Sequence, residues 1–249
     1  MFELNKIHNV DARVLLGAME SGSVDLIVAD PPYGEKQATW DSEKPDNELW
    51  AEYFRVLKEG GVIYYWGFWG HADWVLSNAK RVGFEPMSRI IWWFRTGRPE
   101  KKSYREDTEE CWYMSKGEPK TFNAEQFLEP YEDTSNYERY GRKGKHPGTV
   151  WIHTRILHNH PENIEHETQK PEALIEKIVL ISSNAGDLVV DPFVGSGTTA
   201  LQCERHKRQW LACDTDSEYC MMATERIERW RAQGVLDFDQ TTIKKANCA

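Results

Sequence analysis

Four consecutive residues, Asp30-Pro31-Pro32-Tyr33, place a carboxylate, a stiff turn and an aromatic ring directly after the apolar run 24–29. Proline lacks the backbone N–H and has a fixed φ, so two prolines in succession end a strand abruptly. Ligands of open α/β sheets bind at the carboxyl ends of strands. We therefore predict a catalytic group in which the Asp30 carboxylate and the Pro31 carbonyl accept hydrogen bonds from an amine, while Tyr33 stacks on its planar base. An ordinary proline turn is the alternative that the tetrapeptide alone leaves open.

A second chemical pattern is the turn Asp191-Pro-Phe-Val-Gly-Ser-Gly-Thr-Thr199, which lies between an apolar run and a helical pattern. Gly195 and Gly197 permit a tight turn and a close approach of the backbone to a ligand. Ala200 stands where the dinucleotide fingerprint has its third glycine, so a pyrophosphate site is weakly supported. Asp214 ends the next apolar run, where an acid can accept the hydroxyls of a ribose. A glycine turn with a ribose acid and no phosphate-binding lysine favours a nucleoside cofactor, and S-adenosylmethionine fits.

The elements that must position these residues alternate between short apolar runs and helical patterns, which predicts an α/β fold with a mostly parallel sheet. We expect strands at 24–29, 61–66, 88–94, 110–114, 187–191 and 209–213. We expect helices over Leu49–Leu57 with an end at Gly60-Gly61, over 71–82, from Pro171 onward, and from Asp216-Ser217 to Gly234.

Residues 115–165 interrupt this alternation, because they are polar and only Val150-Trp151-Ile152 resembles a strand. A long irregular stretch inside a compact domain is usually functional. We interpret it as a recognition insertion within one domain that spans residues 1–249.

Composition limits the class of protein. The five cysteines are scattered without a Cys-x-x-Cys pair, which argues against a disulfide framework and a zinc ribbon. There is no apolar run of membrane-spanning length and no signal peptide, so we expect an intracellular protein.

The net charge of −9 argues against a nucleic-acid partner, but the positive residues are grouped. Phosphate contact requires a local positive surface, which two stretches supply, although solvated loops are the alternative for both. The predicted DNA-binding residues are Arg98, Lys101, Lys102, Arg139, Arg142, Lys143 and Lys145.

Taken together, the motifs resemble the β-class amino-methyltransferases of DNA, over nearly the whole chain. In that family the catalytic tetrapeptide comes first, then a recognition segment, then the cofactor turn, as in Asp30–Tyr33, 115–165 and Phe193-x-Gly195-x-Gly197. The family phrase Thr168-Gln169-Lys170-Pro171 is also present. Three features depart from the family pattern: Glu167 replaces a proline, Ala212 replaces a glycine, and the recognition segment is short.

The resemblance implies a circularly permuted, Rossmann-like methyltransferase fold with a mixed, mostly parallel sheet flanked by helices. It implies site-specific transfer of a methyl group from S-adenosylmethionine to N6 of an adenine flipped out of double-stranded DNA. The catalytic residues would be Asp30, Pro31, Pro32 and Tyr33. The cofactor-binding residues would be Asp11 (adenine), Asp214 (ribose), Lys170 (carboxylate), Phe193, Gly195, Gly197 and Thr198 (methionine portion), with Asp30 and Asp191. Residues 35–46 could close over the flipped base.

Several alternatives remain open at this point. Asp at position 30 favours adenine over cytosine N4, which is the second interpretation. Methylation of RNA and a non-catalytic DNA-binding relic are weaker ones. The resemblance also raises a homodimer, a cognate restriction endonuclease and a bacterial or phage origin with a cytoplasmic location.

Weaker signals receive structural interpretations. Trp66, Phe68, Trp69 and Trp74 are expected in the core rather than around a base. The histidines His153, His158, His160 and His166 match no zinc spacing, so no metal is expected. Glu109-Glu110 is expected to begin an edge strand.

Overall fold

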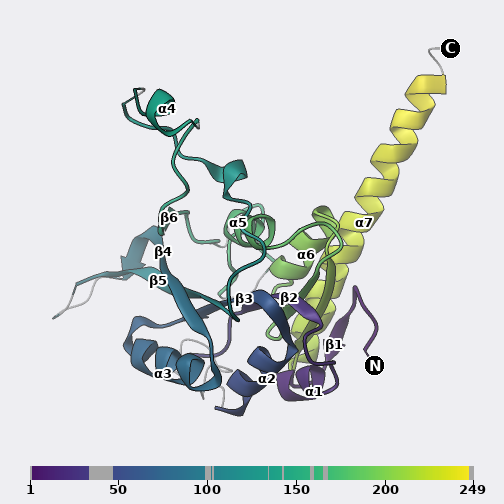
Figure 1. The fold of residues 1–249 in the computed structure, drawn as a ribbon. Helices are drawn as coiled ribbons and strands as arrows, with labels where there is room; N and C mark the ends of the chain where they lie inside the picture. The colour runs from purple at the N-terminus through teal and green to yellow at the C-terminus, as the bar shows by residue number, and fades with distance from the viewer. Residues whose placement is uncertain are drawn as a thin grey trace.

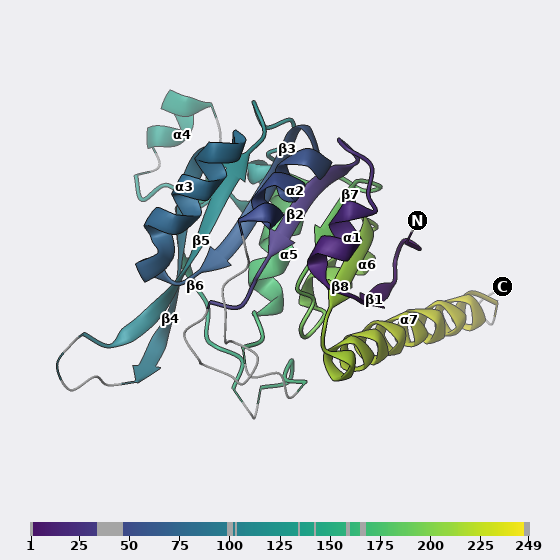
Figure 2. The ribbon, with the colours of Figure 1, turned by 90° about the horizontal axis from the view of Figure 1, so that it is seen from below.

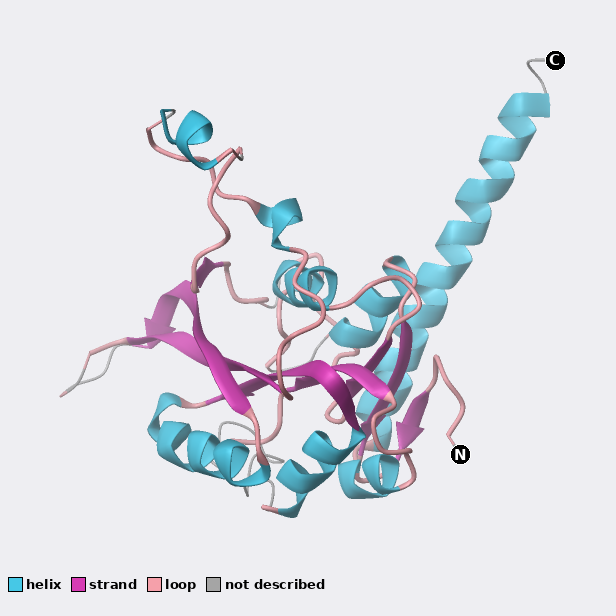
Figure 3. Cartoon of the chain, viewed as in Figure 1, coloured by secondary structure: helices cyan, strands magenta, loops and turns pink. Residues whose placement is uncertain are grey.

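The computed structural model describes residues 2–33, 47–98, 102, 104–133, 135–141, 143–157, 160–164 and 168–246. One eight-stranded sheet with the order β1-β8-β7-β2-β3-β5-β4-β6 forms its centre (Figures 1 and 3). Its strands are β1 (Ile7–Asn9), β2 (Val24–Ala29), β3 (Leu57–Gly67), β4 (Glu85–Arg98), β5 (Glu106–Ser115), β6 (Val150–Ile152), β7 (Leu188–Asp191) and β8 (Gln209–Asp214). The α-helices are α1 (Ala12–Gly17), α2 (Glu48–Val56), α3 (Ala72–Val82), α4 (Ser135–Tyr140), α5 (Glu172–Ser182), α6 (Thr198–Arg205) and α7 (Ser217–Ala246), with short 3-10 turns at Trp69–His71 and Ala124–Phe127.

The sheet is mixed and mostly parallel, which confirms the predicted class of fold. Strand β5 runs antiparallel to its neighbours β3 and β4. The other described pairs are parallel. The reversal at β5 makes β4 run in the same direction as β2, so both strands end at the same edge of the sheet. The hairpin between β4 and β5 therefore extends beyond the edge at which ligands of such sheets bind (Figure 2).

Helices cover both faces of the sheet. Figure 1 shows α1, α2 and α3 beneath the sheet and α5, α6 and α7 on its other face. Successive residues of β2 belong to two separate apolar clusters, because the side chains of a strand point alternately to its two faces. Leu26 and Val28 pack with α5 and α6, whereas Ile27 and Ala29 pack with α1 and α2. The buried strand β2 thus holds its last residue, and the tetrapeptide after it, between two packed layers.

The largest difference from the predicted elements lies around Gly60-Gly61. Helix α2 ends at Val56, and β3 begins at once at Leu57, so the expected helix end at these glycines is wrong. The glycines instead lie in β3 at an irregularity in its pairing with β2. Gly60 has a φ of +78°, and a Cβ there would lie 2.5 Å from Lys120 Cγ. The segment that contains Lys120 therefore passes β3 so closely that a side chain at position 60 would collide with it.

Two further predictions of elements fail at the ends of the chain. The short edge strand β1 was not predicted, because three residues carry too little periodicity. Helix α7 continues through Gly234 to Ala246, so the predicted stop at this glycine is wrong. A glycine inside a helix costs only about 1 kcal/mol relative to alanine, and no proline follows it here.

The segment 115–165 contains the predicted strand β6, the helix α4 and a bridge between Glu129 and Lys145. It leaves the sheet where β5 ends, and Asn123 N–H donates to the carbonyl of Ile181 near the end of α5. Figure 2 shows α4 at the opposite end of the molecule from the tip of the β4–β5 hairpin. In the described part of the chain, no helix combines the length and the apolarity needed to cross a bilayer.

Candidate active site

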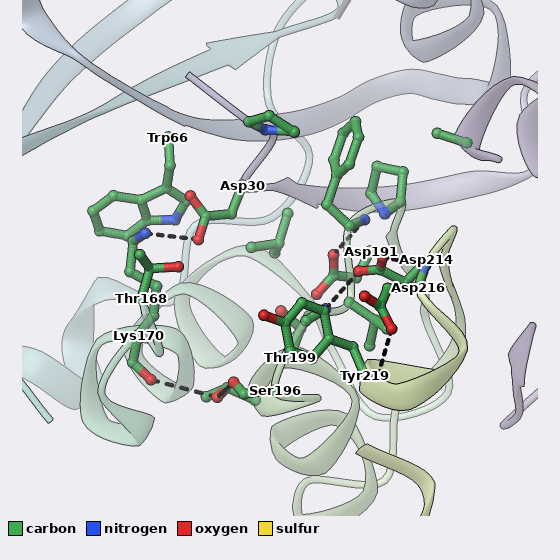
Figure 4. A pocket seen from close by; sticks show the side chains of 18 of the residues that line it. Asp30, Trp66, Thr168, Lys170, Asp191, Ser196, Thr199, Asp214, Asp216 and Tyr219 are labelled. Atoms are coloured by element: carbon green, nitrogen blue, oxygen red, sulfur yellow. Dashed lines mark hydrogen bonds and ion pairs between the residues drawn. The ribbon is translucent and has the colours of Figure 1, made fainter. Parts of the chain in front are cut away.

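A cavity of about 520 Å³ opens at the carboxyl edge of the sheet, between the ends of β2 and β7. Figure 4 shows two groups of side chains around it: Asp30, Trp66 and Lys170 on one side, and Asp191, Asp214, Asp216 and Tyr219 on the other. Most of the predicted catalytic and cofactor-binding residues line this cavity, namely Asp11, Asp30, Pro32, Lys170, Asp191, Phe193, Gly195, Thr198 and Asp214. The other predicted catalytic and cofactor-binding residues, Pro31, Tyr33 and Gly197, do not line it.

The Asp30 carboxylate is held by two donors. The Tyr33 hydroxyl donates to Oδ1 over 2.8 Å, and the Lys170 ammonium donates to Oδ2 over 2.6 Å. Burial, reinforced by the charge of Asp30, raises the pKa of Tyr33 well above its ordinary value, so this phenol remains a donor. Tyr33 packs partly buried against the core on the α5 face. In this structure Tyr33 thus orients the Asp30 carboxylate. The stacking role predicted for Tyr33 did not include this contact.

Lys170 is the centre of the first group. Its side chain is 7% exposed, and its ammonium lies 2.6 Å from Asp30 Oδ2 and 3.2 Å from Glu109 Oε2. Burial opposes the charge, but the two carboxylates outweigh it and raise the pKa of Lys170. The ammonium also lies 5.2 Å from the centroid of the Trp66 ring. The expected contact of Lys170 with a cofactor carboxylate stays a prediction, since its charge already faces two acids of the chain.

Glu109 is the residue that the sequence did not reveal. It was expected to begin an edge strand, but β5 lies between β3 and β4 inside the sheet. The edge-strand interpretation is therefore wrong, because a polar start of a strand does not reveal where the strand sits. A buried cation such as Lys170 needs acidic partners. The presence of this lysine in the sequence could therefore have indicated that a second acid lies beside it.

The aromatic residues at the end of β3 and after it divide between core and surface. Trp66 is fully buried, as expected for a core residue, and also forms part of the cavity wall. Trp69 is 62% exposed, so its expected place in the core is wrong. It begins a 3-10 turn just after β3 ends, and its ring lies against that of Phe68 with the centroids 5.4 Å apart.

The glycine turn builds the opposite wall of the cavity. Gly195 and Gly197 have φ values of +43° and +74°, which only glycine adopts readily. The backbone N–H of Gly195 donates to Asp214 Oδ2 over 3.0 Å, so the acid that ends β8 fixes the turn that follows β7. A Cβ at Gly197 would lie 2.8 Å from the Cβ of Ala223 in α7. The turn is therefore closed from behind by α7.

A buried arginine from α7 also supports the turn. Arg226 donates to the carbonyl of Ser196 over 2.9 Å and to Thr198 Oγ1 over 3.1 Å. Its other terminal nitrogen donates to Glu172 Oε1, at the start of α5, over 2.7 Å. The conformation of the glycine turn thus depends on α5 and α7 together.

Asp191 is a buried acid at the start of the turn. It accepts a hydrogen bond from the backbone N–H of Phe193 over 3.1 Å. Burial raises the pKa of Asp191 to about 7, against a partial opposing effect of a hydrogen bond from Thr199. Burial likewise raises the pKa of Asp214. A ligand that brings a cation or hydroxyl donors next to Asp191 and Asp214 would stabilise the ionised form of these acids.

Asp11 lies at the start of α1 on the rim of the cavity. Its carboxylate caps the helix by accepting from the backbone N–H of Arg13 over 2.8 Å, and pairs with the guanidinium of the same residue. The hydrogen bond from Arg13 lowers the pKa of Asp11 against the effect of burial. Its predicted contact with the adenine of a cofactor stays a prediction.

The predicted DNA-binding residues occupy two separate places. Lys102 is exposed near the tip of the β4–β5 hairpin, and Arg98 ends β4. Arg139, Lys143 and Lys145 are exposed on or beside α4, and Figure 2 shows α4 well away from the carboxyl end of β2. Lys101, Arg142, the predicted closing loop 35–46 and the histidines His158 and His166 lie outside the described residues. Within the described residues, no group of three or more His, Cys, Asp or Glu side chains is placed to hold a metal ion.

Comparison with known proteins places this arrangement among related chains. A family model described as DNA methylase matches residues 24–225, a range that contains both sides of the cavity. The chain is 33% identical over 224 residues to the type II methyltransferase M.HpaI of Haemophilus parainfluenzae, covering 84% of this chain and 70% of that one. It is 33% identical over 247 residues to YhdJ of Escherichia coli (strain K12), covering 91% and 83%. The solved structure of the M1.HpyAVI–SAM complex is similar with a TM-score of 0.66 and 24% identity, covering 89% and 98%.

Proposed function

This chain belongs to the DNA methylase family, and from that membership we propose that it transfers a methyl group from S-adenosylmethionine to N6 of a flipped adenine in double-stranded DNA. The observation that carries the proposal is the single cavity that joins the Asp30 carboxylate to the glycine turn after β7. The relative YhdJ is named a DNA adenine methyltransferase, which supports adenine as the target. The permuted β-class order of motifs and the single domain over 1–249 remain predictions.

The chemistry of Asp30 follows from its place. The exocyclic nitrogen of adenine is a poor nucleophile, because its lone pair is delocalised into the ring. Hydrogen bonds from this amine to the Asp30 carboxylate and the Pro31 carbonyl would favour a more tetrahedral nitrogen and stabilise the positive charge that develops on it. Such preorganised electrostatic stabilisation is usually the largest single contribution to a rate enhancement. Tyr33 and Lys170 hold the carboxylate in place for this role.

The second group of residues suits the cofactor. The cavity volume of about 520 Å³ lies within the usual range of small-molecule sites. Asp191 and Asp214 offer buried acceptors for an ammonium group and for ribose hydroxyls, and the Gly195–Thr198 backbone forms the wall between them. When bound, S-adenosylmethionine would supply a methyl group on a sulfonium centre: the nitrogen lone pair would attack the methyl carbon in line, the carbon–sulfur bond would break and the neutral thioether would leave. The methylated nitrogen would then lose its extra proton to solvent. The described side chains are therefore placed to orient both reactants.

A product analysis tests the proposed reaction. We expect the purified protein to transfer labelled methyl groups from S-adenosylmethionine to unmethylated duplex DNA. Digestion to nucleosides and mass spectrometry should then show N6-methyladenine. Single-stranded RNA of the same sequence should remain unlabelled in a parallel reaction. N4-methylcytosine as the sole product would overturn the adenine assignment and leave the methyltransferase assignment intact.

We also propose that the β4–β5 hairpin contacts the DNA near the target base. The hairpin extends beyond the same edge of the sheet that holds Asp30, and Tyr104, near its tip, is 94% exposed. Lys102 and Arg105 flank this aromatic ring and are exposed. Basic side chains interleaved with an aromatic one suit a nucleic-acid backbone and its bases. The basic residues around α4, being farther from the cavity, would reach only flanking phosphates.

The salt dependence of DNA binding measures how many phosphates these residues neutralise. For the double variant Lys102→Ala/Arg105→Ala, we expect the plot of log affinity against log salt to become less steep by about 0.9 for each phosphate that is no longer neutralised. The variant Lys143→Ala/Lys145→Ala should show a smaller change. Lys80→Ala, an exposed lysine near the end of α3, is the control and should leave the slope unchanged. A wild-type slope in the hairpin variant would contradict the proposed role of the hairpin.

The remaining parts of the proposal concern the cellular setting. We propose a cytoplasmic enzyme that meets chromosomal or phage DNA directly. A cognate restriction endonuclease that cuts the same sequence would make it one half of a restriction–modification pair. A homodimer is a further part of the proposal, and light scattering at working concentration tests it.

A further inference from the structure

Beside the cavity, the charges of Asp30, Lys170 and Glu109 do not sum to zero. Asp30 follows β2, Lys170 precedes α5 and Glu109 lies within β5, so three separate elements bring them together. One ammonium faces two carboxylates, at 2.6 Å from Asp30 Oδ2 and 3.2 Å from Glu109 Oε2. The three groups together carry one net negative charge.

This excess charge depends on Glu109. An isolated pair of Asp30 and Lys170 would be neutral, and a lysine 2.6 Å away would offset most of the field of the carboxylate at a nearby amine. A second acid shares the lysine and restores a net negative charge. Arg155 lies 3.5 Å from Glu109 Oε1, but its side chain is 41% exposed, so solvent screens its charge more strongly.

The geometry of Glu109 fits this sharing. Its Oε2 atom is buried and accepts no hydrogen bond from the described residues, although the lysine ammonium lies 3.2 Å away. An ammonium has three donors, and the contacts of Lys170 with Asp30 and the Tyr33 hydroxyl use two. The third donor is free for Glu109, and a small movement of the lysine toward Glu109 would complete this contact and lengthen the one with Asp30 Oδ2.

We propose that Glu109 is a positioning residue of the methyl transfer: by sharing Lys170, it keeps the Asp30 carboxylate available to the target amine. This inference rests on the proposed function, because it assumes that Asp30 accepts the amine. Glu109 itself does not line the cavity in the described structure and contacts Asp30 only through the lysine.

The test compares two neighbouring acids. Glu109→Gln removes the charge but keeps the shape of the side chain. We expect the single-turnover rate constant of methyl transfer to fall at least about 10-fold, with the dissociation constants of DNA and S-adenosylmethionine within about twofold of wild type. Glu110→Gln is the matched control, since Glu110 is the next acid of β5, faces the other side of the sheet and pairs with Arg89 at 3.7 Å. It should remain within about twofold of wild type; equal rates for the two variants would overturn the proposal.

A double-mutant cycle distinguishes positioning from a general structural role. In a Lys170→Met background, Glu109→Gln should have little further effect, because its only route to Asp30 is gone. The same fold loss in both backgrounds would overturn a role through the lysine. Glu109→Asp retains the charge and should be faster than Glu109→Gln, whatever the effect of each on the melting temperature; the reverse order would also overturn the proposal. Absence of product from wild type and from Glu110→Gln alike would instead overturn the proposed function, and this inference with it.

Discussion

Replacing Asp30 by alanine is expected to lower the rate constant of methyl transfer by about 10²- to 10³-fold, the usual effect of removing one preorganised transition-state contact. The variant loses the acceptor that stabilises positive charge on the attacking nitrogen. It should still fold, because Lys170 retains Glu109 as a partner at 3.2 Å and no buried cation is left alone. Single-turnover experiments with saturating cofactor and duplex DNA measure this change directly.

The affinity for S-adenosylmethionine provides the control for Asp30→Ala. Asp191, Asp214 and the glycine turn remain in place, so calorimetry should give a dissociation constant within a few-fold of wild type. Asp73→Ala, an exposed acid in the first turn of α3, should leave the rate unchanged. A wild-type rate in Asp30→Ala would contradict the mechanism, whereas loss of both rate and cofactor binding would show that Asp30 supports the whole cavity.

Gly197→Ala is expected to have the second large effect, on both folding and cofactor affinity. The backbone φ of +74° disfavours an L-residue by about 1–2 kcal/mol. The new Cβ would lie 2.8 Å from the Cβ of Ala223 and force the turn away from α7, which typically costs about 1–3 kcal/mol. Urea denaturation should show a free energy of unfolding lower by about 2–5 kcal/mol, the sum of the two effects. The affinity for S-adenosylmethionine should fall with the displaced turn.

Gly186→Ala separates the two causes. Its φ is +89°, but nothing lies within 4 Å of an added Cβ, so only the backbone cost applies. Its free energy of unfolding should fall by about 1–2 kcal/mol, with unchanged cofactor affinity. Equal destabilisation of the two variants would contradict the steric contact with α7.

The sequence predicted the site best where one element dictates local geometry. The prolines after β2 end that strand at Ala29, and the glycines after β7 adopt the positive φ that only glycine accepts readily. Both predictions depend on backbone sterics, which neighbouring residues determine. The alternation of apolar runs predicted all six internal strands. Burial on both faces of an internal strand leaves a continuous apolar signal in the sequence.

The prediction failed where distant elements decide. Nothing near Glu109 in the sequence indicates that β5 inserts between β3 and β4, or that residue 170 meets it there. Gly60-Gly61 suggested a helix end, whereas the crossing segment at Lys120 is what requires a glycine. The place of α4, away from the carboxyl end of β2, could likewise not be read from the basic composition of that segment.

The support of the glycine turn by α7 has a consequence for synthesis of the chain. Two residues of α7 support the turn: Ala223 packs behind residue 197, and Arg226 donates hydrogen bonds to residues 196 and 198. Both follow the turn in the sequence and are synthesised after it. On the ribosome, β2 and the tetrapeptide after it emerge early, but the glycine turn lacks the support of Ala223 and Arg226 until α7 has left the exit tunnel. A nascent chain should therefore acquire affinity for the cofactor late, in one step, and premature termination before residue 226 should yield a product that cannot compete for the cofactor.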